Sequence, residues 1–315
     1  ASDRSRESKG EMIAAVAASL LFAISITCGH RASHVFGGAS ANFWRLVIAT
    51  GLLGVWSFTF GIGLGGAGFT YFFISGLVGF GLGDVALYQA LPRLGSRLAM
   101  LFTQCLAAPF AVVIERFWLG TQLSGLQILC ITTILGGVGL ALAPHETVKR
   151  DPREWRLGTM FGVLAGLGGA LGAVFSRKAF SAIANAGQQI DGANAAFQRI
   201  IGGLIVGGIF LWFIRWQTNR GGGEFVRDGG KRTGGTQRAW LLVLGNAIAG
   251  PTIGVSCMQW ALRTTPTGIV LAIIAMTPLA VIPLARIYEN ERPTLRSLAG
   301  SVMAVVGVIG LTQLR

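Results

Sequence analysis

Long stretches without a charged side chain constrain the fold of this sequence more than any other feature. No Asp, Glu, Lys or Arg occurs from Met12 to Gly29, and none occurs from Leu46 to Gly83. A helix that crosses a bilayer needs roughly 20 consecutive apolar residues. Charged residues form 12% of the chain, against about 25% in soluble globular proteins. We therefore expect an all-α integral membrane protein.

Polar residues separate the apolar segments into ten predicted spanning helices. Among the connections, two polar stretches stand out, the central 144–156 and the glycine-rich 217–238. The central stretch is a predicted linker between two halves, 1–143 and 157–315, with five helices each. The predicted helices cover residues 12–34, 38–60, 70–91, 94–116, 120–143, 157–180, 192–216, 239–262, 266–287 and 294–313.

The two halves repeat each other in sequence. The segment 41–47, which contains Arg45, resembles 195–201, which contains Arg199, and the two arginines are 154 residues apart (199 − 45). The Ala-Leu pairs at 90–91 and 261–262 are 171 residues apart (261 − 90), and the longer loop of the second half explains the difference. Because each half has an odd number of helices, the second enters the membrane from the opposite side. The sequence thus predicts two inverted five-helix repeats, an architecture common among secondary transporters.

Several short motifs resemble the EamA-type drug/metabolite transporters. They are the two arginine-containing segments, the Ala-Leu pairs, Thr277-Pro278, Glu291-Arg292 and the glycines at 300, 307 and 310. The resemblance covers nearly the whole chain and is weaker in the first half, where Pro109 precedes Glu115 by six residues, against thirteen from Pro278 to Glu291. It implies a ten-helix exporter of the cytoplasmic (inner) membrane, most similar to the amino acid and metabolite exporters, including the aromatic amino acid branch.

Asp84 is the acidic residue that lies deepest in a predicted span. A charged side chain at the centre of a spanning helix costs about 2.5–3.5 kcal/mol on insertion scales, so Asp84 is expected to face protein or water. One hypothesis is that it binds a substrate ammonium group or a coupling proton. The alternatives are an ion pair with Arg45 or Arg199 and a position nearer the helix end.

Arg45 and Arg199 are the repeat-equivalent arginines near the starts of their helices. Either could bind a substrate carboxylate. A long arginine side chain near a helix end also extends readily to the headgroups. The resemblance implies that this arginine is shared by members with different substrates, which favours a structural role.

A polar stripe on the eighth predicted helix marks a candidate cavity wall. Thr252, Ser256 and Gln259 share one helical face, and Gln259 corresponds to Tyr88, which follows Asp84 by one turn. Hydrogen bonds between packed helices would explain the stripe equally well. Trp260 lies deeper than the expected interfacial tryptophans and is a candidate for stacking on a planar substrate.

The sequence predicts no catalytic site, metal site or cofactor. Its four cysteines and three histidines lack metal-ligand spacing, and an enzyme would need clustered reactive side chains. The net charge of +13 comes mostly from loop cations, which suit anionic headgroups rather than nucleic acid. The expected partners are a small-molecule substrate and the lipid bilayer. The oligomeric state is left open, and a monomer is compatible with the sequence.

Two further questions stay open at this stage. The loop cations favour both termini outside the cell, whereas the resemblance implies termini in the cytoplasm. The main prediction is export of amino acids or related metabolites by alternating access. A proton-coupled exporter of organic cations or drugs is the alternative, and a channel or membrane enzyme is the alternative from another class.

Overall fold

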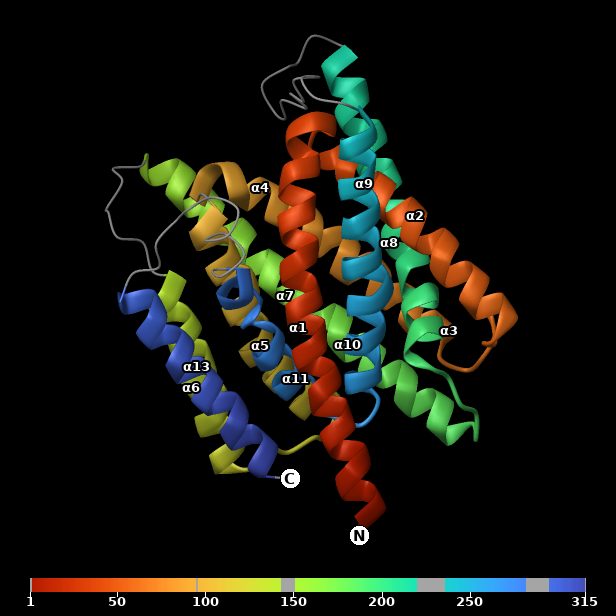
Figure 1. The fold of residues 1–315 in the computed structure, drawn as a ribbon, viewed down its shortest axis with the longest axis vertical. Coiled ribbons are helices and arrows are strands. Elements are labelled where there is room, and N and C mark those ends of the chain that lie inside the picture. The colour runs from red at the N-terminus through yellow and green to blue at the C-terminus, as the bar shows by residue number, and fades with distance from the viewer. Residues whose placement is uncertain (1, 95, 143–150, 220–235, 282–294, 315) are drawn as a thin grey trace.

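The computed structural model describes residues 2–94, 96–142, 151–219, 236–281 and 295–314, and all regular secondary structure in these ranges is helical. The helices pack together as one bundle (Figure 1). The α-helices are α1 (Ser2–Phe36), α2 (Gly38–Thr59), α3 (Phe69–Gly76), α4 (Asp84–Leu94), α5 (Ser96–Leu119), α6 (Gly125–Leu142), α7 (Pro152–Asn185), α8 (Gly192–Asn219), α9 (Thr236–Ala247), α10 (Val255–Leu262), α11 (Thr267–Ile274) and α13 (Leu295–Gln313).

Two of the spans are interrupted by a π-helical segment. The segment η1 (Leu77–Gly83) joins α3 to α4, and η2 (Ile248–Gly254) joins α9 to α10. Both are 7 residues long, and they begin 171 residues apart (248 − 77), the separation already found for the Ala-Leu pairs. Glycines in η1 and Pro251 in η2 weaken the regular hydrogen-bond ladder. Such segments are frequent at functional sites.

Helix length and apolar composition identify a multi-pass membrane protein. Within the described ranges, 7 helices are long and apolar enough to cross a membrane, and two shorter apolar helices cover 267–281 and 295–311. The 22-residue α2 is a further helix of the bundle. The exact count of ten spans stays a prediction. The start of α1 and the end of α13 lie at the same end of the bundle, which we call the terminal face (Figure 1).

The packing of the helices fits the predicted two-repeat organisation. The interrupted span α3–η1–α4 lies against α7, and its counterpart α9–η2–α10 lies against α1. Helices that correspond to each other also pack together, namely α2 with α8, α5 with α11 and α6 with α13. In two units related by a pseudo-twofold axis, the first helix of each unit packs against the interrupted span of the other unit.

The helix bounds differ from the sequence prediction mainly at polar ends. Helices α1 and α7 extend beyond the predicted 12–34 and 157–180. Helix α7 begins early because the Asp151 side chain accepts a hydrogen bond from the amide of Arg153 and proline follows at the first helical position. The predicted helix 266–287 is interrupted, since α11 ends at Ile274. Its residues 282–287 lie outside the described residues, as do 144–150 of the predicted linker.

Candidate functional site

Asp84 stands where η1 passes into α4, at the interruption of the third predicted span. It is the first residue of α4. Its Oδ2 atom lies 3.8 Å from Nη2 of Arg45, and the two side chains are 24% and 22% exposed. This separation makes an ion pair that is too long for a hydrogen bond. Among the described residues Oδ2 has no hydrogen-bond partner, so the carboxylate keeps its capacity to accept one.

The repeat-equivalent arginine on α8 approaches the same carboxylate. Arg199 is 5% exposed, and both it and Arg45 interact electrostatically with Asp84. Its guanidinium carbon lies 4.9 Å from the centre of the Phe80 ring, within cation–π range. The Nε and Nη1 atoms of Arg199 have no hydrogen-bond partner within the described part of the chain. We call Asp84, Arg45 and Arg199 the charge cluster.

Glycines in and next to η1 leave space for Arg199 of this cluster. A Cβ atom at Gly79 would lie 2.7 Å from Nη2 of Arg199, and one at Gly76 would collide with the carbonyl oxygen of Arg199. Arg45 is oriented separately, because its Nε donates a hydrogen bond of 2.7 Å to Oδ1 of Asn42 one turn earlier. The glycines of α3 and η1 therefore permit α8 to approach closely enough for Arg199 to reach the cluster.

Gln259, for which a cavity wall and a helix contact were both open, contacts a neighbouring helix. Its side chain is fully buried, and its Nε2 donates to Oγ of Ser176 on α7 over 3.2 Å. Oγ of Ser176 lies 2.8 Å from Oγ of Ser75 on α3. Ser256 donates to the carbonyl oxygen of Thr252 in its own helix. For Gln259, these contacts favour the hypothesis of hydrogen bonds between packed helices.

Replacing Gln259 with Leu tests that assignment. We expect the stability to change by no more than about 1 kcal/mol, because Ser176 keeps its contact with Ser75 and an unpaired amide oxygen is removed. The KM for transport should stay unchanged. Thr50→Ala, which removes only a hydrogen bond to the carbonyl oxygen of Leu46 within α2, is the matched control. A rise in KM for Gln259→Leu alone would restore the cavity-wall hypothesis.

Ser256 and Trp260 line a pocket of about 530 Å³ at the terminal face. The same pocket contains Asp191 at the start of α8 and Arg263 just after α10. Trp260 is 48% exposed. The side chain of Tyr88 lies outside the described residues. Six of the eight predicted site residues are thus divided among the charge cluster, the contact between α7 and α10, and this pocket, while Thr252 lies in η2.

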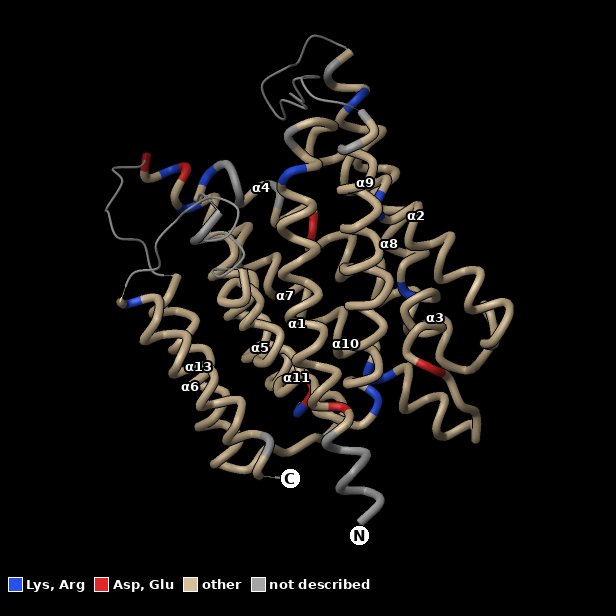
Figure 2. The backbone as a smooth tube through the Cα atoms, viewed as in Figure 1, with Lys and Arg blue, Asp and Glu red and all other residues tan. Residues whose placement is uncertain are grey.

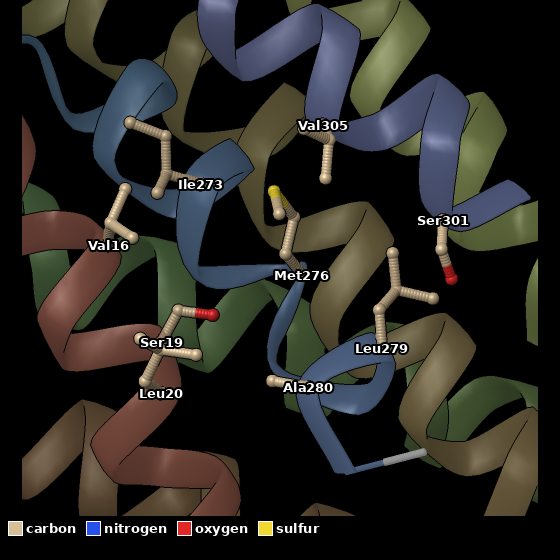
Figure 3. Close-up of a pocket in the computed structure, with 9 residues that line it drawn as sticks. All are labelled: Val16, Ser19, Leu20, Ile273, Met276, Leu279, Ala280, Ser301 and Val305. Atoms are coloured by element: carbon tan, nitrogen blue, oxygen red, sulfur yellow. The ribbon is translucent and has the colours of Figure 1, made fainter. Parts of the chain in front are cut away.

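A second cavity, of about 220 Å³, lies between α1, α11 and α13. Figure 3 shows Val16, Ser19, Ile273, Met276 and Val305 around a shared space, on ribbons far apart in sequence. Two serine hydroxyls are the polar side chains in an otherwise apolar lining. Because none of its lining residues is charged, this cavity is poorly suited to an ionic substrate.

An ion pair near the terminal face was not anticipated from the sequence. Nε of Arg177 lies 3.4 Å from Oε1 of Glu115, which is 2% exposed. Arg177 stands near the end of the predicted helix 157–180, where a cation is ordinarily expected to face headgroups or water. Most of the described charged residues do lie toward the two ends of the bundle (Figure 2). Only the structure shows that Glu115 is buried, and this burial is what identifies the pair.

Comparison with known proteins identifies the family. A family model described as "EamA-like transporter family" matches residues 9–143 and 156–313. A solved structure titled "Crystal structure of protein" superposes with a TM-score of 0.69 at 15% identity, covering 98% of this chain and 96% of the other. At that identity the likeness concerns the fold alone. No curated protein matches the chain. The family match covers both halves, and the chain therefore belongs to the EamA-like transporter family.

Proposed function

We propose that this membrane transporter exports amino acids or closely related small metabolites by alternating access across the cytoplasmic membrane. The charge cluster carries the proposal. It places one carboxylate and two guanidinium groups beside the interruption of a spanning helix. Charged groups in that region are costly, and they mark substrate or ion pathways in membrane proteins.

The composition of the cluster suits a zwitterion. An amino acid carries an ammonium group, which Asp84 can accept, and a carboxylate, which the unpaired nitrogens of Arg199 can bind. Arginine binds carboxylates well because its planar donors match the two oxygens. With two cations for one anion, the cluster has a net positive charge and favours substrates that bring a carboxylate.

A proton-coupled exporter of organic cations or drugs is the second candidate. One observation favours it: Oδ2 of Asp84 has no hydrogen-bond donor among the described residues, as expected of a carboxylate that receives a proton or a cation. The two arginines oppose it, because a cationic ligand would have to compete with both of them for one carboxylate.

Counterflow in proteoliposomes separates these candidates. Liposomes loaded with an unlabelled amino acid should accumulate the labelled form transiently and saturably, and organic cations should fail to compete. Competition by organic cations together with flux driven by a pH gradient would favour the second candidate instead. A channel would give flux that does not saturate, and an enzyme would convert the label chemically.

A further inference from the structure

One buried ion pair stabilises both ends of the turn between α10 and α11. Nη1 of Arg177 donates a hydrogen bond of 2.9 Å to the carbonyl oxygen of Leu262, the last residue of α10. Oε2 of Glu115 accepts a hydrogen bond of 2.6 Å from the amide of Thr267, the first residue of α11. Unpaired carbonyls end one helix and unpaired amides begin the next, so each charge faces the helix end that it complements.

The same turn is also attached to α1. The hydroxyls of Thr264 and Thr265 donate to Oε2 of Glu11, which is fully buried. Glu115 belongs to α5 and Arg177 to α7. Five helices therefore meet at this turn, and their buried polar contacts join both halves of the chain at the terminal face.

The ion pair described at the opposite face is more exposed. Nε of Arg93, near the end of α4, lies 3.2 Å from Oε2 of Glu154 on α7. Glu154 is 51% exposed, whereas Glu115 is 2% exposed. An ion pair open to solvent contributes little, while loss of one partner of a buried pair leaves an uncompensated charge.

We propose that the Glu115–Arg177 pair is a lock that holds the terminal face closed, and that the transport cycle breaks it to open that face. The proposal rests on alternating access from the proposed function. In the complementary state the turn between α10 and α11 leaves Glu115 and Arg177, and the terminal face opens. Glu115 and Arg177 are positioning residues in this cycle and do not contact the substrate.

Cysteine accessibility from each side of the membrane tests the lock. Ser176 is fully buried next to Arg177, so Ser176→Cys, in a chain whose four native cysteines are replaced, reports opening at this level. In Glu115→Gln or Arg177→Gln, a membrane-impermeant thiol reagent applied to the terminal face should label it about tenfold faster or more, as expected when a buried pair loses a partner. Labelling from the opposite face should not rise.

Matched variants keep this test independent of folding and of substrate identity. Glu154→Gln removes the exposed partner at the opposite face and should leave terminal-face labelling unchanged. Arg177→Lys keeps the charge but loses the forked donors, and its labelling rate should lie between those of wild type and Arg177→Gln. Unchanged labelling in well-folded Glu115→Gln, or an equal rise from both faces, would overturn the lock. Counterflow without any amino acid specificity would overturn the proposed substrate and leave the labelling result intact.

Discussion

Asp84→Asn is expected to lower amino acid counterflow by about tenfold or more while the protein still inserts and remains monodisperse. The substitution keeps the size of the side chain and removes the negative charge that faces Arg45 and Arg199. The two arginines are then left without their shared anion, and the site loses its acceptor for a substrate ammonium group. Both losses should slow transport. The loss of the shared anion should also alter how α2 and α8 approach the interrupted span.

A second Asp→Asn substitution, made away from the charge cluster, serves as the control for the chemical change itself. Asp151 is exposed at the start of α7, where its Oδ1 accepts a hydrogen bond of 3.0 Å from the amide of Arg153. Asparagine serves equally well at this position of a helix, so Asp151→Asn should transport at nearly the wild-type rate. Initial counterflow rates at equal protein density measure both variants. Wild-type transport by Asp84→Asn would refute a role for the charge cluster in substrate binding.

The sequence alone predicted much of the fold because lipid imposes strong and simple constraints. A spanning helix must be apolar over its length, so composition locates it without knowledge of its neighbours. The duplication was visible for a similar reason, since corresponding helices keep corresponding arginines and Ala-Leu pairs. The same separation of 171 residues later related η1 to η2.

For the candidate site, the sequence named candidate residues but not their contacts. It named Asp84, Arg45 and Arg199 and left their pairing open, and the structure brings all three together. It grouped Gln259 with Ser256 because helical spacing assigns a face, but spacing does not say which helix covers that face. Gln259 meets Ser176, whereas Ser256 lines a pocket with Trp260.

The π segments and the Glu115–Arg177 pair could not be predicted from the sequence, for different reasons. Glycines in a spanning helix usually serve close packing, so their number does not distinguish a π turn from a regular helix. Glu115, Arg177 and Thr267 are far apart along the chain, and a charge near a helix end ordinarily faces headgroups or water. Their burial depends on how the helix ends converge, which a single sequence does not encode locally.

Gly76→Ala is expected to destabilise the protein by about 2 kcal/mol or more, the scale of overpacking in a dense interior. A Cβ atom at this position would collide with the backbone carbonyl oxygen of Arg199 and lie 3.1 Å from the amide nitrogen of Gly203. Backbone atoms of a long helix cannot move aside as a flexible side chain can. Helix α8 would therefore shift away from α3, and the guanidinium of Arg199 would shift with it.

Gly51→Ala supplies the comparison, because it adds the same methyl group to α2 where no described atom outside the helix's own backbone and the neighbouring residues lies within 4 Å of the added Cβ. There the substitution should be neutral or stabilise the helix by up to about 1 kcal/mol, since alanine restricts the unfolded chain more than glycine does. Thermal unfolding in detergent measures both variants. Equal melting temperatures would mean that α3 and α8 do not approach as closely as Arg199 requires. A lower melting temperature for Gly76→Ala, together with impaired counterflow, would tie the small residues of the interrupted span to the geometry of the charge cluster.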